Sequence, residues 1–312
     1  MTIFDTPRFR VFALCATVVF VALFGLLFTH HIAAVHASRR SVAEADARVV
    51  FPTDDSHTDL RTGSAPNPTR TPVVVELFTS EGCSSCPPAD ALLAHLLKDQ
   101  PVPNADILVL EEHVDYWNSL GWNDRFSSHQ LTARQTQYAH DLHLDSVYTP
   151  QMVVDGTNQF VGNDSSYAVS AISHSARAPK LNLAISALAV DGRQLSGTIS
   201  LTAGTTDVSD ADLYAAVVES SASTEVKEGE NGGRTLQHVS IVRNLQRIGR
   251  SADAVAAPLK FTVCTPADTA AANLRVVILL QRAGQGAILA AASSPQAPVP
   301  APAISTAVHS GT

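Results

Sequence analysis

The feature that most constrains the fold is a pair of cysteines, two residues apart, between a strand-like and a helix-like segment. Residues 72–79 are short, rich in β-branched side chains and almost all apolar, which predicts a buried strand. Cys83 and Cys86 follow in a loop, and residues 89–98 have the leucine spacing of an amphipathic helix. A Cys-x-x-Cys pair between a strand and a helix is typical of thiol redox proteins.

The position of the pair predicts how the two thiols differ. Cys83 lies near the open end of the predicted helix, where unpaired N–H groups and the helix dipole stabilise a thiolate. Pro87 and Pro88 fit the first helical turn, which needs no backbone donors. We therefore expect Cys83 to be the nucleophile and Cys86 the less exposed, resolving thiol.

Three other interpretations of the pair remain open. A structural disulfide is common in exported proteins. Zinc would need two more soft ligands. The folded part of the chain has one further cysteine, Cys264, which lies far along the chain and is expected to be a buried apolar residue. Copper held by Cys83, Cys86 and His113 is the third. We favour thiol–disulfide exchange without a cofactor over all three.

The N-terminal segment, residues 1–37, predicts export. An apolar run at 11–28 follows Arg8 and Arg10, which is the charge order of a segment whose C-terminal side crosses the membrane. The run is either an uncleaved membrane anchor, which we favour for its length, or a signal peptide cleaved after Ala37. The first outcome leaves the protein anchored on the periplasmic or extracytoplasmic side, and the second makes it a secreted protein.

Composition divides the rest of the chain into two folded regions with polar ends. Residues 38–71 are predicted to be a disordered linker, and 293–312 a disordered tail. Residues 72–178 alternate strand-like and helix-like segments, which predicts an α/β domain with a mixed sheet flanked by helices. Residues 179–292 consist mostly of strand-like segments, which predicts an antiparallel, sandwich-like β domain.

The charge of the chain bears on its partners. Lys and Arg number 21 against 29 Asp and Glu, for a net charge of −8, and no dense basic cluster is present. Nucleic acid is therefore not expected as a partner. The expected partner is a protein that carries a thiol or a disulfide.

Three acidic or histidine side chains are candidates for an auxiliary role. Glu76, within the first strand, is either a buried acid that takes a proton from the second cysteine or a paired carboxylate. His113 and Asp115 end the second predicted strand and share one face of an extended segment. They could orient a proton carrier or bind a metal with the thiols, although we favour a structural role for His113.

Several motifs resemble those of known families. Thr149 and Pro150 directly precede a short apolar strand, as in the thioredoxin superfamily, and residues 72–178 resemble that superfamily. More narrowly, motifs over about residues 72–292 are similar to those of the DUF1223 family. These motifs lie at residues 76–90, 113–117, 121–122, 149–156 and 228–238.

The resemblance implies a thioredoxin-like fold, with Cys83 and Cys86 as the redox pair and a cis peptide bond between Thr149 and Pro150. Such a bond leaves the backbone of Thr149 free to bind an extended partner. DUF1223 proteins are secreted or membrane-tethered and of unknown function, so the resemblance supplies no substrate. The Ser-Ser between the cysteines differs from familiar thioredoxins, so the direction of electron transfer does not carry over.

A glycine-rich stretch at 229–233 does not match a phosphate-binding motif and predicts the tip of a hairpin. We favour a hairpin on the surface over one that folds back to the cysteine loop and presents Arg234 and His238.

Overall fold

The computed structural model describes residues 70–202 and 204–296. The apolar run at 11–28, nearly all of the expected linker and most of the expected tail lie outside these residues. Within the described part of the chain, no helix is both long and apolar enough to cross a membrane.

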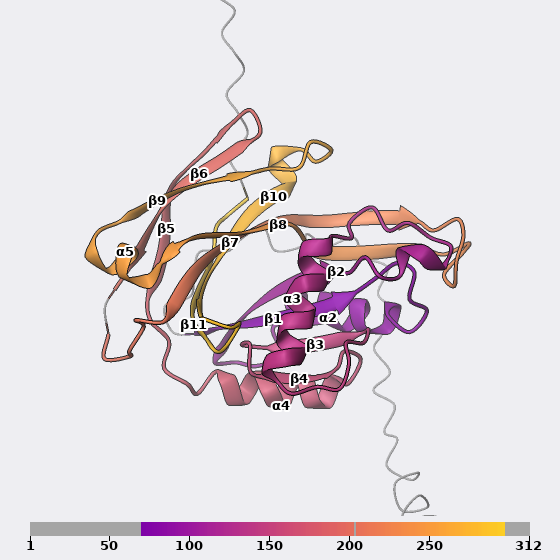
Figure 1. The fold of residues 1–312 in the computed structure, drawn as a ribbon, viewed down its shortest axis with the longest axis horizontal. Coiled ribbons are helices and arrows are strands. Elements are labelled where there is room, and N and C mark those ends of the chain that lie inside the picture. The colour runs from indigo at the N-terminus through magenta and orange to yellow at the C-terminus, as the bar shows by residue number, and fades with distance from the viewer. Residues whose placement is uncertain (1–69, 203, 297–312) are drawn as a thin grey trace, which may run out of the picture. The chain divides into compact units, whose positions relative to one another are not determined.

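An eight-stranded mixed sheet forms the centre of the fold, in the order β11-β10-β7-β8-β2-β1-β3-β4 (Figure 1). β1 is parallel to β2 and antiparallel to β3, which pairs with β4 in a hairpin. The strands are β1 (Thr71–Thr79), β2 (Ala105–His113), β3 (Gln151–Val154), β4 (Asn158–Val161), β7 (Ala211–Glu225), β8 (Thr235–Arg250), β10 (Leu274–Arg282) and β11 (Ile288–Ser293).

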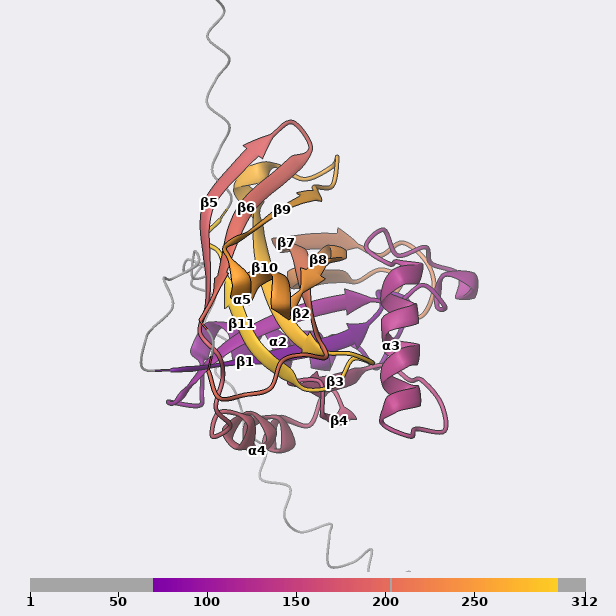
Figure 2. The same cartoon turned by 60° about the vertical axis from the view of Figure 1, so that its left-hand side comes forward.

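Three helices cover the two faces of the β2-β1-β3-β4 half of this sheet, which is thioredoxin-like (Figure 2). Helices α2 (Pro87–Asp99) and α4 (Ser165–Ser175) pack on one face, and α3 (His129–Asp141) packs on the other. Alternation along β1 explains the division. Val73, Val75 and Leu77 enter the core under α2 and α4, and the intervening Val74 and Phe78 enter the cores on the α3 side.

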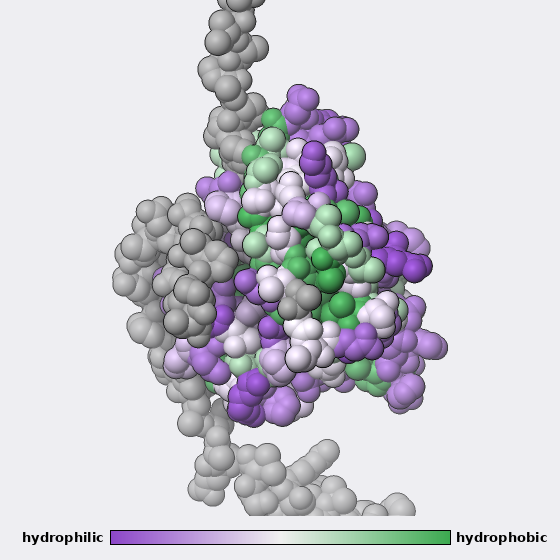
Figure 3. All heavy atoms as spheres, turned by 90° about the vertical axis from the view of Figure 1, so that its left-hand side faces the viewer, coloured by the Kyte–Doolittle hydropathy of each residue, from purple (hydrophilic) through white to green (hydrophobic). Residues whose placement is uncertain are grey.

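A second, three-stranded antiparallel sheet comprises β5 (Leu183–Asp191), β6 (Gln194–Leu201) and β9 (Leu259–Cys264). Its inner side chains share one core with the β7, β10 and β11 part of the large sheet. The face of the molecule on this side carries apolar groups among polar ones (Figure 3). The short helix α5 (Ser251–Ala256) joins β8 to β9.

The predicted fold class, a thioredoxin-like α/β part followed by mostly antiparallel strands, is confirmed. The large sheet continues past the predicted boundary at residue 178, because Glu111 of β2 pairs with Ile241 of β8. Among the strands and α-helices of the described residues, β8, α5 and β11 were not predicted. The expectation that Cys264 is buried is wrong, since this cysteine is free and exposed at the end of β9.

Candidate functional site

Cys83 and Cys86 form a disulfide at the start of α2, with their Cα atoms 5.4 Å apart. Cys86 is the N-cap residue of the helix, and Pro87 and Pro88 occupy its first turn, as expected for residues without a backbone donor. The exposed fraction of both cysteines is 0%. The expected difference in exposure between the two thiols is therefore absent in this oxidised state.

The Thr149–Pro150 peptide bond is cis, and it lies at the same edge of the sheet as the cysteine loop. The next residue, Gln151, pairs with Phe78 near the end of β1, just before the chain enters that loop. Trp117 connects the two places. Its Nε1 donates to Thr149 Oγ1 at 2.8 Å, and its Cβ packs against Gly82, where an added Cβ would lie only 3.2 Å away.

The hairpin loop between β7 and β8, residues 226–234, also packs against the cysteine loop. Asn231 is fully buried, and its Nδ2 donates to the backbone carbonyls of Glu81 and Cys83, both at 2.9 Å. The N–H of Ser84 donates to Glu230 Oε2 at 3.0 Å. The favoured interpretation of a surface hairpin is therefore wrong, because side chains of this loop satisfy backbone groups beside the disulfide.

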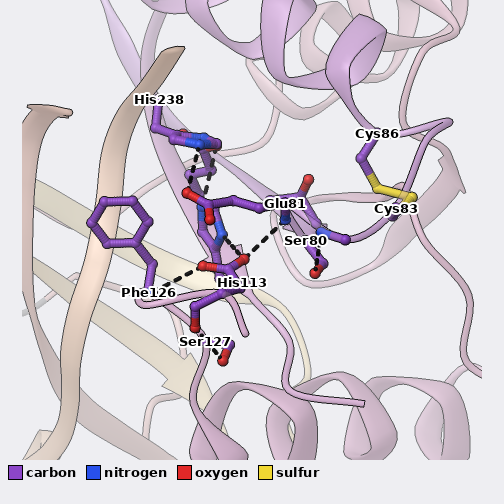
Figure 4. A network of polar contacts seen from close by, with 12 residues as sticks. Ser80, Glu81, Cys83, Cys86, His113, Phe126, Ser127 and His238 are labelled. Atoms are coloured by element: carbon purple, nitrogen blue, oxygen red, sulfur yellow. Dashed lines mark hydrogen bonds and ion pairs between the residues drawn. A yellow bond between two sulfur atoms is a disulfide. The ribbon is translucent and has the colours of Figure 1, made fainter. Parts of the chain in front are cut away.

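Five buried ionisable side chains form a continuous chain of contacts behind the cysteine loop, here named the acid–histidine cluster (Figure 4). His113 lies between two acids, with Nδ1 2.7 Å from Asp124 Oδ2 and Nε2 3.3 Å from Glu111 Oε1. His238 also lies between two acids, with Nδ1 2.7 Å from Glu111 Oε1 and Nε2 3.3 Å from Glu81 Oε1. The cluster joins β2, β8 and the cysteine loop.

Opposite charges hold this cluster together against the cost of burial. Burial alone would lower the pKa of both histidines, but Asp124 and Glu111 raise the pKa of His113 well above its usual range. Glu111 likewise raises the pKa of His238 to about 9. Burial would raise the pKa of Glu111, yet His238 and His113 lower it to about 2. Each histidine of the cluster therefore has its pKa raised by the carboxylates on either side of it.

Asp90 is a buried acid on the α2 side that the sequence analysis missed. It follows Cys86 by one helical turn, so both residues lie on the same side of α2. The Thr79 hydroxyl donates to its Oδ1 at 2.7 Å. The pKa of Asp90 is raised to about 7, first by burial and then by the carboxylate of Glu111, while the charge of His238 opposes the shift.

Glu76 is fully buried and paired. Its carboxylate accepts from Arg134 Nε at 2.7 Å and from the Tyr138 hydroxyl at 2.6 Å, both on α3. Glu76 lies between Val75 and Leu77 on β1, so its side chain points to the face opposite α2. These contacts support the paired-carboxylate interpretation. Its suggested role as proton acceptor for Cys86 stays an untested prediction.

Asp115 and His113 have different surroundings. Asp115 contacts α3, where its carboxylate accepts from the Thr132 hydroxyl and lies 3.3 Å from His129 Nδ1. A second tryptophan contributes to the site, because Trp122 Nε1 donates to Glu81 Oε2 at 2.6 Å. Of the auxiliary residues expected from the sequence, His113 is therefore the one that joins the acid–histidine cluster.

A family model described as "Protein of unknown function (DUF1223)" matches residues 74–281, which contain every residue of the site described above. The chain belongs to the DUF1223 family. No curated protein matches the chain.

Two solved structures are similar to this DUF1223 protein. Protein AGR_C_4864 from Agrobacterium tumefaciens has 28% sequence identity and a TM-score of 0.53, covering 72% of this chain and 94% of that one. HBP35 of Porphyromonas gingivalis has 17% identity and a TM-score of 0.51, covering 74% of this chain and 78% of that one. The second likeness concerns the fold alone.

The contacts of Asn231 predict how this DUF1223 protein shields its disulfide. Asn231→Ala removes two hydrogen bonds to the cysteine loop, each worth about 0.5–1.5 kcal/mol, so local opening becomes easier. We expect dithiothreitol to reduce the disulfide about tenfold faster in the variant, measured by alkylation and mass spectrometry.

Asn244→Ala is the matched control, because Asn244 also donates to a backbone carbonyl, that of Cys264, but has no contact with the cysteine loop. Its reduction rate should equal that of the wild type. Equal rates for Asn231→Ala and the wild type would mean that the hairpin loop does not limit access to the disulfide.

Proposed function

We propose that the chain is an exported thiol–disulfide oxidoreductase, anchored in the membrane by residues 11–28, that exchanges disulfides with a partner protein. The observation that carries the proposal is the Cys83–Cys86 pair at the N-terminus of α2, at the same sheet edge as the cis Thr149–Pro150 bond. This combination offers a reactive sulfur and a backbone segment beside it on which an extended partner can dock.

The reaction needs only the two thiols and two protons. In the reducing direction, the Cys83 thiolate attacks a partner disulfide, forms a mixed disulfide and releases one partner thiolate. The Cys86 thiolate then attacks the Cys83 sulfur, which closes the intramolecular disulfide and releases the second partner thiolate. The partner gains two electrons and the Cys83–Cys86 pair loses two. The oxidising direction is the reverse of these steps.

Access to the sulfurs requires movement of their surroundings, because both cysteines are completely buried. The hairpin loop is the element to displace, since Asn231 and Glu230 hold it to the backbone around Cys83. In this proposal, a partner opens the loop as it docks against Thr149.

The same burial favours a second candidate function, in which the disulfide is only structural. Structural disulfides resist reduction by the glutathione pool, with reduction potentials below about −300 mV. For copper, the contacts offer less support, because the two ring nitrogens of His113 face Asp124 and Glu111 and not the cysteines (Figure 4).

Mixed-disulfide trapping separates the two candidates. We expect Cys86→Ser to accumulate a covalent complex through Cys83 in the cell envelope, because the resolving thiol is missing. The experiment is done in a Cys264→Ser background, which removes the exposed thiol that would give unrelated adducts. The double variant Cys83→Ser/Cys86→Ser in that background is the control and should trap nothing.

Absence of any complex, together with a potential below about −300 mV for the pair, would contradict the redox function and favour the structural disulfide. A complex that is lost on adding dithiothreitol, with a potential in the range of exchanging proteins, would support the oxidoreductase.

A further inference from the structure

We propose that the acid–histidine cluster is a binding site for one divalent transition-metal ion, with Glu111, His113 and His238 as ligands. Zinc is the ion that best matches this set. The site is distinct from the cysteine pair and does not depend on the proposed redox function.

The spacing of the ligand atoms suits a single ion. One ligand atom from each of Glu111, His113 and His238 lies within 4.8 Å of the others. Around tetrahedral zinc, with bonds of about 2.0–2.2 Å to nitrogen and oxygen, ligand atoms are separated by about 3.4 Å. His113 Nε2 is 3.3 Å from Glu111 Oε1, and His238 Nδ1 is 2.7 Å from the same oxygen. An ion among these three atoms would take the place of the protons that they share, and His238 Nε2 would keep its contact with Glu81 Oε1 at 3.3 Å.

Some buried atoms of the cluster face an opposite charge without a well-formed hydrogen bond. The Nε2 atoms of His113 and His238 and the Oε1 atom of Glu81 are buried, and none of the three has a hydrogen bond of acceptable geometry, although each nitrogen lies 3.3 Å from a carboxylate oxygen. Poorly satisfied buried polar atoms are rare and costly in proteins. A cation bound to His113 Nε2 would take the place of the proton on that nitrogen, because metal binding requires a deprotonated imidazole.

Neighbouring groups hold these side chains in the orientation that a metal needs. Asp124 Oδ2 accepts from His113 Nδ1, which leaves the lone pair of Nε2 free for a metal, the arrangement of a carboxylate–histidine–metal triad. The carboxylate of Asp124 is itself fixed by the N–H groups of Glu81 and Phe126. Glu111 Oε2 accepts from the N–H of Val239, so that Oε1 is the oxygen that faces the histidines.

The chemistry of the ligands indicates the class of ion. Two imidazoles and carboxylate oxygens suit zinc and other borderline divalent metals, whereas copper(I) prefers thiolates. The ligands come from β2 and β8, so a bound ion would connect the thioredoxin-like half of the sheet to the antiparallel half.

The test uses the full chain with its disulfide intact, stripped with a chelator, incubated with zinc chloride and desalted. We expect one zinc per chain by mass spectrometry of the metal, and about tenfold or greater loss of affinity for His113→Gln or His238→Gln. His140→Gln is the matched control, because His140 is an exposed histidine, and it should retain one zinc. Cys83→Ser/Cys86→Ser should also retain one zinc.

Cobalt(II) provides a readout on the wild type that does not depend on how the variants fold. We expect an absorption spectrum of four-coordinate cobalt without a thiolate charge-transfer band. No zinc on the wild type, one zinc retained by the His113→Gln/His238→Gln double variant, or zinc lost when the cysteines are replaced would each overturn the proposed site.

Discussion

Replacing Arg134 with methionine is expected to lower the free energy of unfolding by about 3–5 kcal/mol, because it removes one partner of a buried ion pair. Arg134 is nearly fully buried, and it donates to Glu76 at 2.7 Å and to the side chain of Gln281 at 3.1 Å. Glu112 Oε1 lies 3.6 Å from Arg134 Nε. Without the guanidinium, Glu76 must be buried unpaired or take up a proton. Urea denaturation followed by circular dichroism measures the change.

Two variants test the cause of that loss. Glu76→Gln in the Arg134→Met background should recover part of the stability, because it removes the uncompensated charge. Arg247→Met is the matched control, since Arg247 pairs with Asp212 on the surface at 2.6 Å, and such pairs contribute about 1 kcal/mol or less. A small effect of Arg134→Met, or a further loss in the double variant, would contradict the assignment of Glu76 as a paired carboxylate.

Replacing Asp90 with asparagine is expected to stabilise the protein above pH 7 and to have little effect near pH 4. Burial raises the pKa of Asp90 in the folded state to about 7, against 3.8 for the ordinary carboxyl. The folded chain therefore holds this proton more tightly than the unfolded chain, and the wild type loses stability as pH rises between these two values. The difference corresponds to about 4 kcal/mol at full ionisation. Asparagine has no proton to lose and keeps the Oδ1 that accepts from Thr79.

The comparison is made by urea denaturation of both proteins at several pH values between 4 and 8. The difference in unfolding free energy should grow with pH and level off above pH 7. Asp145→Asn, at an exposed position, is the control and should run parallel to the wild type. A pH-independent difference for Asp90→Asn would mean that Asp90 is already ionised at low pH in the folded state.

The strand and helix that carry the cysteines were predictable because each has a strong local signal. Residues 72–79 are apolar throughout, and the structure has β1 at Thr71–Thr79. The leucine spacing predicted a helix over 89–98, whereas α2 begins two residues earlier, at Pro87. The two prolines fit the first turn of a helix but do not add to its apolar pattern. The start of α4 has a local signal too, because Asp164 is its N-cap and accepts from the N–H of Tyr167.

Long-range features of the site were not predictable from local patterns. β8 contains Arg243, Asn244 and Arg247, which weaken a strand signal, yet it is the strand that brings His238 to Glu111. Pairing between β2 and β8 joins residues more than a hundred positions apart, and no periodicity in either segment specifies its partner.

The face of β1 on which Glu76 lies could have been inferred from the sequence. Alternation along β1 assigns Val75 and Leu77 to one face and Glu76 to the other. Once α2 is placed over Val75 and Leu77, Glu76 cannot be beneath the same helix as Cys86. The acid on the side of α2 is Asp90, whose position one turn after Cys86 was a signal available in the sequence.

The position of β2 between β1 and β8 determines how a shorter fragment of the chain would behave. A fragment that ends after α4 would lack β8 and leave β2 as the outermost strand, without its pairing at Glu111. Glu111 and His113 would then lose His238 and the cover that keeps them from water. Such a fragment would be prone to self-association, although its composition alone makes it look like a separate module.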